Sequence, residues 1–162
     1  MECTIINCCE NGDLGHLQEL CAKTTKDLSS VTDRDGFSPL LTAIHNYQNH
    51  IVHFLLSLPD FSIEKVSNSY KSNPLHVAAY KRNLGALQML LHHCYEKKVL
   101  DKLVNQQDKW GKTPLHHAVY HGFTPGIDIL LRHEVVDRSV KDYNQKVPMD
   151  YLRSDMDASL FL

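Results

Sequence analysis

The stretch Asp108-Lys109-Trp110-Gly111-Lys112-Thr113-Pro114-Leu115-His116-His117-Ala118-Val119 decides the fold. Thr113 is a good helix N-cap because its hydroxyl can accept an orphan backbone N–H group, and proline suits the next position, where no amide hydrogen is needed. Gly111 stands three residues before the proline, where a tight turn favours positive φ. The stretch therefore predicts a turn followed by a short helix that begins at Pro114.

Related segments recur along the chain, as Ser38-Pro39-Leu40, Asn73-Pro74-Leu75 and Val147-Pro148-Met149. The four prolines are spaced by 35, 40 and 34 residues. A leucine pair follows each of the first three prolines at a constant distance, within an apolar stripe typical of an amphipathic second helix. Self-similarity at this period is the signature of a repeat solenoid. The leucine pairs are Leu55-Leu56, Leu90-Leu91 and Leu130-Leu131.

Two further positions are shared between the units. A turn-forming residue stands six positions before each proline, and a small residue that permits close helix approach stands four positions after each of the first three prolines. Thr4 stands 35 residues before Pro39, so a first unit without the proline keeps the same frame. The turn formers are Asp33, Asn68, Asp108 and Asp142, and the small residues are Ala43, Ala78 and Ala118, with Cys8 in the first unit.

This pattern resembles the ankyrin repeat, whose motif is close to Asp-x-x-Gly-x-Thr-Pro-Leu-His-x-Ala-Ala. The resemblance implies an all-α ankyrin-repeat solenoid of stacked helix-turn-helix units with short β-turn fingers. We expect a single domain over 1–162, with an N-terminal capping repeat at 1–32 and a C-terminal half-repeat cap at 142–162. The full repeats between them are expected at 33–67, 68–107 and 108–141. Because a repeat cannot bury its face alone, two caps favour a complete short array.

Three departures from the motif carry expectations of their own. Lys71 and Gln145 replace the turn glycine, so their fingers are expected to bend differently. The 40-residue spacing adds residues around 92–107, which should lengthen the second helix or its loop. Only a short segment follows Pro148, with room for one helix.

Composition excludes several classes of protein. The 162 residues are 43% hydrophobic and 22% charged, which is ordinary globular usage. A net charge of −2 does not make the broad basic field that non-specific nucleic-acid binding needs. The longest apolar run, 51–58, is far shorter than a membrane span. Five cysteines, an odd number without a Cys-x-x-Cys pair, favour a reducing cytosol. We expect a cytoplasmic protein, with nuclear entry left open.

The rival class is a metal protein or an enzyme. Eleven histidines invite a metal hypothesis, and His117 and His121 are spaced to share a helix face, yet no third ligand stands at a recognised zinc spacing. Nothing places a cysteine, a base and an oxyanion hole together. We therefore expect no catalysis, no metal and no cofactor. Stoichiometric zinc or one hyper-reactive thiol would favour the rival.

The resemblance implies a concave surface made by the fingers and the inner helices. Exposed tyrosine and tryptophan are enriched at interface hot spots, and lysines contribute to steering and orientation. The alternative is that the rings pack on the adjacent finger and only stiffen the array. The expected partner-binding residues are Phe37, His45, Tyr70, Tyr80, Lys81, Lys109, Trp110, Lys112, Tyr120 and His121.

The resemblance thus implies a non-catalytic module that binds another protein, either an extended acidic segment or a folded surface, and acts as an adaptor or an inhibitor. We expect a monomer that binds neither nucleic acid nor membrane. An alternative is a pathogen-encoded effector, acting in the host cytoplasm, or a protein resembling inhibitors of Rel-type transcription factors, which masks a host signalling protein.

Overall fold

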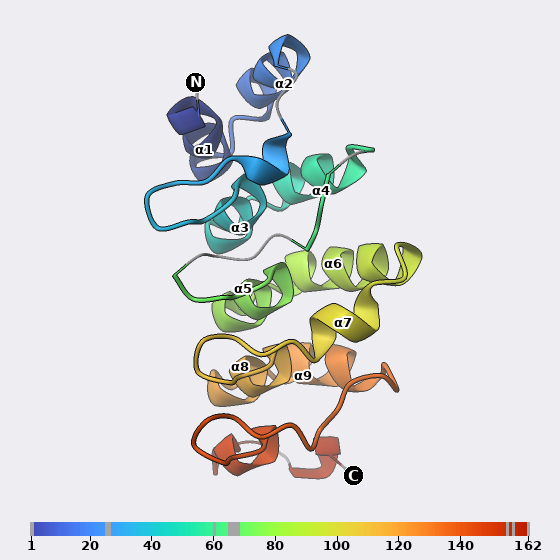
Figure 1. Cartoon of the computed structure of the whole chain (residues 1–162). Helices are drawn as coiled ribbons and strands as arrows, with labels where there is room; N and C mark the ends of the chain where they lie inside the picture. The colour runs from blue at the N-terminus through green and yellow to red at the C-terminus, as the bar shows by residue number, and fades with distance from the viewer. Residues whose placement is uncertain are drawn as a thin grey trace.

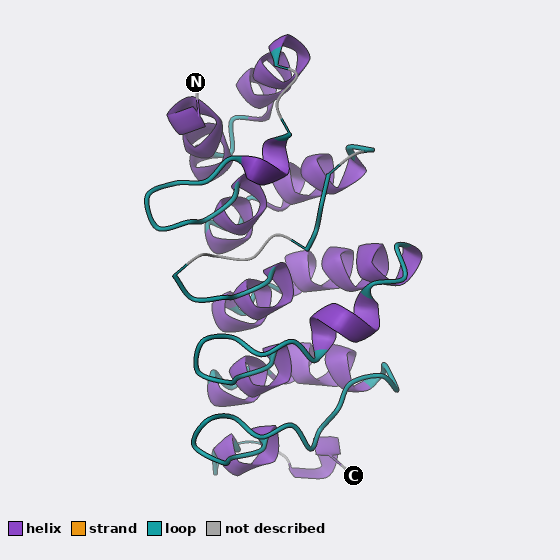
Figure 2. Ribbon diagram, in the orientation of Figure 1, coloured by secondary structure: helices purple, strands orange, loops and turns teal. Residues whose placement is uncertain are grey.

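A computed structural model describes residues 2–24, 27–59, 61–64, 69–154, 156 and 158–161. Antiparallel helix pairs are stacked in one column, and the loops between pairs project to one side as fingers (Figure 1). The part of the chain that the structure describes contains no β-strand (Figure 2), which confirms the all-α solenoid. The pairs are α1 (Glu2–Asn11) with α2 (Leu14–Lys23), α3 (Pro39–His45) with α4 (Asn49–Ser57), α5 (Pro74–Lys81) with α6 (Leu84–Glu96), and α8 (Pro114–Tyr120) with α9 (Thr124–Leu131).

The inner helices α3, α5 and α8 begin as their sequences predict. Ser38, Asn73 and Thr113 have extended backbone, and each side chain accepts the backbone N–H of the residue three positions later. A proline follows each cap at the first helical position, where its missing N–H costs nothing. Local capping chemistry therefore defines the start of every inner helix after α1.

The small residue in each unit lets neighbouring inner helices approach. Ala43, Ala78 and Ala118 are fully buried, and Cys8 is 4% exposed at the matching place in α1. The first leucine of each predicted pair is also fully buried, on the outer helices α4, α6 and α9. The apolar core therefore runs continuously along the column, as stacking of nearest neighbours requires.

The finger that contains Gln145 has the same backbone geometry as the finger that contains Gly111. In the last finger, the Asp142 N–H donates to the carbonyl oxygen of Lys146 at 2.9 Å, as the Asp108 N–H does to that of Lys112. Gln145 has a φ of 62°, close to the 76° of Gly111. The expectation that the Gln145 finger bends differently is therefore wrong, because the side chain is held in the left-handed region that glycine favours.

The second finger also has a residue other than glycine in the left-handed region. Lys71 takes a φ of 53°, again in the left-handed region. Such a conformation costs about 1–2 kcal/mol for a residue with a Cβ atom. The hydrogen bond from the Lys109 N–H to the Tyr70 carbonyl oxygen and the stacking of Tyr70 on Trp110 act against this cost. The turn former Asn68 lies outside the described residues.

The long spacing adds helix, as expected. At thirteen residues α6 exceeds the nine of α4 and the eight of α9, and the extra helix α7 (Leu100–Val104) follows it. Leu100, Leu103 and Val104 are all buried, so the insertion extends the core. None of the described helices is both long and apolar enough to cross a membrane.

The C-terminal segment differs from the single helix predicted. It forms two short 3-10 helices, η2 (Pro148–Tyr151) and η3 (Ala158–Phe161), and a third, η1 (Leu28–Ser30), precedes the first finger. Pro148 is buried against the preceding repeat, while Met149 and Asp150 are exposed. With few residues and little apolar surface, this end cannot repay the ordering of a full α-helical pair. The proposed repeat boundaries remain predictions.

Candidate functional site

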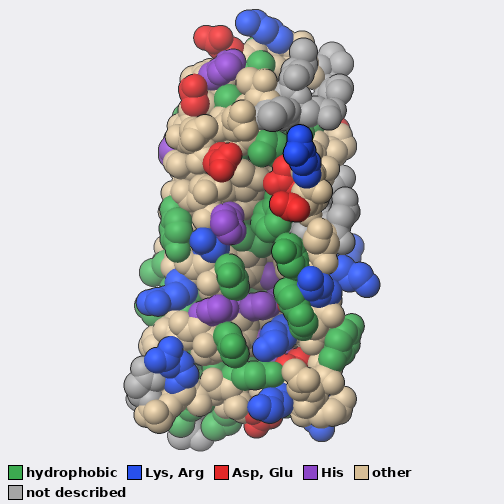
Figure 3. Space-filling model, turned by 90° about the vertical axis from the view of Figure 1, so that its left-hand side faces the viewer, with side chains coloured by type: hydrophobic (Ala, Val, Ile, Leu, Met, Phe, Trp, Pro, Cys, Tyr) green, Lys and Arg blue, Asp and Glu red, His purple; other side chains and the backbone are tan. Residues whose placement is uncertain are grey.

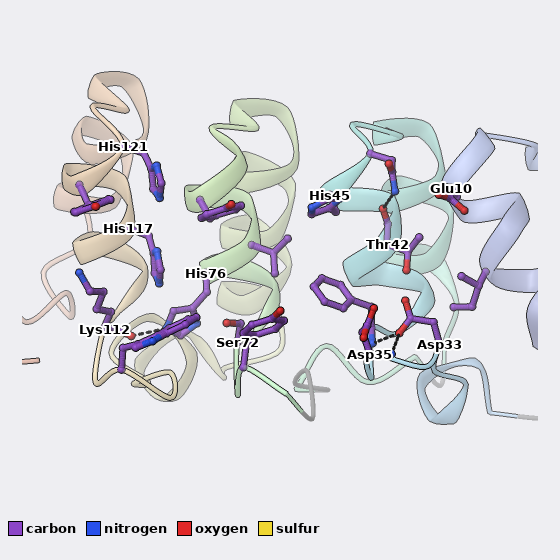
Figure 4. A pocket seen from close by; sticks show the side chains of 18 of the residues that line it. Glu10, Asp33, Asp35, Thr42, His45, Ser72, His76, Lys112, His117 and His121 are labelled. Carbon is purple, nitrogen blue, oxygen red and sulfur yellow. Dashed lines mark hydrogen bonds between the residues drawn. The ribbon is translucent and has the colours of Figure 1, made fainter. Parts of the chain in front are cut away.

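A groove of about 890 Å³ runs along the fingers and the inner helices (Figures 3 and 4). The inner helices supply one wall, because their exposed turns face away from the outer helices, and the fingers supply the other. Of the ten residues predicted from sequence, Lys81 and Lys109 are not among those that line the groove. The eight that line it are Phe37, His45, Tyr70, Tyr80, Trp110, Lys112, Tyr120 and His121.

Aromatic rings from three successive fingers form a continuous row. The rings of Phe37 and Tyr70 meet edge to face with centroids 6.2 Å apart, and those of Tyr70 and Trp110 stack at 5.8 Å. The ammonium of Lys109 lies over both stacked rings, 4.1 Å and 4.4 Å from their centroids. The rings do pack on the adjacent finger, as the stiffening alternative holds. Tyr70 and Trp110 nevertheless stay 37% and 45% exposed.

A second row of rings lies on the inner helices. The ring of Tyr80 on α5 meets that of His121 on α8 at 4.8 Å, and His117 and His121 lie parallel at 6.2 Å. The four-residue spacing of these histidines thus places them on one helix face, as predicted. Tyr80 and Tyr120 are each at least half exposed. Burial lowers the pKa of His121, and the nearby His117 adds to the effect.

Lys112 is held inside the groove by the last repeat. Its ammonium lies 3.9 Å from the ring centroid of Tyr151 and 4.7 Å from that of Tyr120, and 3.9 Å from a carboxylate oxygen of Asp142. Burial lowers the pKa of Lys112, although the negative charge of Asp142 acts in the opposite direction. Tyr151 was not predicted as a groove residue, because its place in the cap is set by packing rather than by the motif.

The finger aspartates of the last two units are buried, and both oxygens of each carboxylate accept hydrogen bonds. Asp108 accepts backbone N–H groups of its own finger through Oδ1, and Oδ2 accepts a 2.7 Å hydrogen bond from Nε2 of His117. Burial acts to raise the pKa of Asp108, but these hydrogen bonds hold it below its ordinary value. Asp142 is bound in the same way, with the hydroxyl of Tyr151 donating to Oδ2.

The two ends of the groove carry opposite charge. Glu10, Asp33 and Asp35 lie at the end formed by α1 and the first finger, and the ammonium of Lys112 lies at the other, on the same side as His117 and His121 (Figure 4). The surface on the side of the fingers has the same distribution of charge. Acidic side chains gather toward its N-terminal end, while basic, histidine and apolar side chains gather in its C-terminal half (Figure 3). Sequence analysis did not predict Glu10 as a groove residue, since no motif position marks it as inward-facing.

Two observations bear on the rival class of metal protein or cysteine enzyme. No group of three or more potential metal ligands occurs within the described ranges. Burial raises the pKa of the Cys9 and Cys94 thiols to about 12, and it also raises those of Cys8 and Cys21. A nucleophilic cysteine needs the opposite shift, so these four thiols are poor nucleophiles at neutral pH.

Three curated proteins are similar to this chain in sequence. The chain is 31% identical over 145 residues to human SMC5-SMC6 complex localization factor protein 1, covering 88% of this chain and 13% of that protein. It is 34% identical over 107 residues to human transient receptor potential cation channel subfamily A member 1, covering 66% and 9%. It is also 30% identical over 90 residues to alpha-latrotoxin-Lg1a of Latrodectus geometricus, covering 56% and 6%. The chain therefore spans a small part of each relative's length.

The family comparison covers more than half of the chain. Residues 5–102 match ankyrin repeats in three copies, and residues 110–143 match a further ankyrin repeat. Repeats of this kind are protein–protein interaction modules and are generally non-catalytic. With its stacked helix pairs, finger turns and inner groove, this chain belongs to the ankyrin-repeat family.

Proposed function

We propose that this protein recognises a partner protein through the groove between its fingers and inner helices, without catalysis. The observation that carries the proposal is the row of contacting rings from Phe37, Tyr70 and Trp110 across three successive fingers, in which Tyr70 and Trp110 stay exposed. Apolar and aromatic surface of this kind supplies most of the binding energy at protein interfaces.

The rings are ordered before a partner arrives. Trp110 is held by Tyr70 on one side and by the ammonium of Lys109, and the backbone N–H of Trp110 is fixed on the carboxylate of Asp108. Side chains that are already ordered lose little conformational entropy on binding. A rigid array therefore converts buried area into affinity more efficiently than a mobile loop would.

Lysines that flank the C-terminal half of the groove, without lining it, favour a partner with acidic groups there. Lys81, Lys109 and Lys146 have no carboxylate within ion-pair distance among the described residues, while the two aspartates nearby are buried and hydrogen-bonded. Exposed lysines act mainly on the association rate and on orientation, and their effect decreases with salt. We propose that an acidic segment of the partner lies against this half.

The test is capture of a partner followed by binding measurements with the purified pair. The Trp110→Ala/Tyr80→Ala variant is compared with wild type and with Tyr95→Ala, which removes a 70% exposed tyrosine outside the groove. Circular dichroism first establishes equal helicity. We expect Tyr95→Ala to bind like wild type and the double variant to lose about 30-fold or more in affinity, as loss of a hot spot does. Equal binding by all three would place recognition elsewhere.

An adaptor and an inhibitor differ in what the bound partner can still do. If the protein masks its partner, it will compete with that partner's other ligands, and excess of the chain will abolish their binding. If it tethers two proteins, a ternary complex will form and a second protein will remain bound when the groove is filled. A competition experiment with the captured partner separates these roles.

A further inference from the structure

Thr42 and Asp33 form an incomplete version of a contact that the last two units complete. In the last two units the groove residue nine positions after the finger aspartate donates a hydrogen bond to its carboxylate. His117 donates to Oδ2 of Asp108, and Tyr151 donates to Oδ2 of Asp142. For the first finger the corresponding residue is Thr42 on α3, whose hydroxyl forms no hydrogen bond with Asp33.

The Thr42 hydroxyl and one carboxylate oxygen of Asp33 are the two groups that the missing contact would join. Thr42 is 6% exposed, lines the groove, and has a hydroxyl oxygen with no hydrogen-bond partner among the described residues. Asp33 uses Oδ1 to accept the backbone N–H groups of Asp35 and Phe37, at 2.9 Å and 2.8 Å, and no side chain of the described residues donates to Oδ2. A buried hydroxyl without a partner is costly, so such a site favours an external donor.

The surroundings specify a positive donor. Glu10 and Asp35 lie at the same end of the groove, and neither has a basic side chain within ion-pair distance in the described part of the chain (Figure 4). Asp33 is half-buried, unlike Asp108 and Asp142, which are each 1% exposed, so its carboxylate is accessible from the groove. Ile6 and Phe37 line the same region and provide apolar surface for an aliphatic stem.

From this arrangement we propose that the groove holds an extended segment of a partner protein in which one lysine inserts its ammonium between Asp33 and Thr42. An ammonium has three donors on a compact head, which suits two separate acceptors, and its four-carbon stem packs on apolar surface. The planar guanidinium of arginine suits a pair of parallel acceptors, which a single carboxylate oxygen and a hydroxyl do not offer. This inference rests on the proposed function and specifies the chemistry of its partner.

The distance between the two charged ends of the groove determines how far apart the lysine and the acidic residue of the bound segment stand. The first finger and the lysine-bearing fingers are two or three repeats apart, and helices pack at roughly 8–10 Å, so the ends are separated by roughly 16–30 Å. An extended chain covers about 3.3–3.6 Å per residue. The bound segment therefore carries its lysine roughly five to nine residues from its acidic residue.

Fluorescein-labelled peptides test the proposal by anisotropy. Each peptide has twelve residues, an apolar centre with one aromatic residue, and a single lysine and a single glutamate at separations from three to ten, in both orders. We expect the tightest binding at separations of five to nine, in one of the two orders. Acetylation of the lysine, which removes its charge, should weaken the best peptide by roughly 3- to 30-fold, and arginine in its place should also weaken binding.

Variants of the protein locate the lysine. Thr42→Val keeps the shape of the side chain without its hydroxyl, and Glu10→Gln/Asp35→Asn removes charge without touching the hydrogen bonds that shape the finger. Both should weaken the lysine peptide and leave its acetylated form unchanged. Thr42→His, which copies the arrangement of His117 and Asp108, should fill the site from within and abolish the lysine preference. Asp101→Asn on α7 is the matched control, since Asp101 is exposed and does not line the groove.

The outcomes are separable from those of the proposed function. Peptides that bind, are lost with Trp110→Ala, and ignore acetylation and Thr42→Val would retain the groove as a protein-binding site but overturn the lysine site. Absence of binding by every peptide would also overturn it. Partner capture, described above, decides the proposed function independently.

Discussion

His76 donates a hydrogen bond from Nε2 to the backbone carbonyl oxygen of Lys112, across 2.9 Å, and so ties the inner helix α5 to the next finger. Its Nδ1 accepts the backbone N–H of Asn73 at 3.2 Å. Since one ring nitrogen donates and the other accepts, the buried ring is neutral. His116 repeats this arrangement with the carbonyl oxygen of Lys146. Imidazole bridges therefore join successive repeats in addition to apolar packing.

Replacing His76 by leucine should destabilise the array. Leu41 occupies the matching position in the second unit, so leucine is compatible with the helix, but two buried backbone groups lose their partner. An unsatisfied buried group costs about 1–3 kcal/mol, so we expect a loss of about 2–4 kcal/mol in the free energy of unfolding. Urea titration measures it, with His92→Leu on the exposed face of α6 as the control. A loss equal to that of the control would show that the bridge contributes nothing.

Stability should fall on mild acidification. Burial, and then the neighbouring His117, lower the pKa of His76 to about 4, from 6.5. The folded state therefore binds fewer protons than the unfolded chain between these values. Full stability is present above about pH 6.5 and declines toward pH 4, by about 1.4 kcal/mol per pH unit and ~3 kcal/mol in all. Burial lowers the pKa of His116 as well, so it acts in the same direction.

Urea titrations at pH 7.5, 6 and 5 measure this slope. The carboxylates do not obscure it, because the pKa values of Asp108 and Asp142 lie below 3.8 and their protonation belongs to lower pH. His76→Leu should reduce the slope between pH 6.5 and 5, leaving the part that His116 contributes. An unchanged slope in that variant would contradict the assignment to His76.

Gly111 and Gln145 occupy the same place in successive fingers and should respond oppositely to substitution. At Gly111, φ is 76° and an added Cβ would lie 2.7 Å from the backbone nitrogen of Tyr143. We expect Gly111→Ala to cost about 1–3 kcal/mol. Gln145→Gly removes a Cβ from the left-handed region and should leave stability unchanged or raise it by up to about 1 kcal/mol. Thermal unfolding of both variants compares them, and equal losses would be inconsistent with this account.

Tyr151→Phe and Thr42→Val remove hydroxyls from matching positions and should differ in effect. The hydroxyl of Tyr151 donates to the buried carboxylate of Asp142, so its loss leaves that carboxylate with one donor fewer and should cost about 1–3 kcal/mol. The hydroxyl of Thr42 has no partner, so its removal should be neutral or stabilising. Chemical denaturation distinguishes the two. A marked loss of stability in Thr42→Val would mean that its hydroxyl is already satisfied.

Local chemistry made most of the fold predictable. Ser38, Asn73 and Thr113 cap helices because a short polar side chain before proline accepts a backbone N–H three residues on, and this depends on neighbours in sequence alone. Where prediction relied on a residue's preference instead, it erred. Gln145 adopts the glycine conformation because hydrogen bonds within its finger outweigh a cost of about 1–2 kcal/mol.

The sequence by itself determined the repeat and its helix starts, since each follows from a fixed spacing between residues close in the chain. Only the tertiary structure decided how the groove residues pair. The stacking of Tyr70 on Trp110 joins separate repeats, and whether a finger aspartate is capped depends on side-chain length: His117 reaches Asp108, but Thr42 does not reach Asp33. Such contacts depend on distances across the folded chain, which no local propensity encodes.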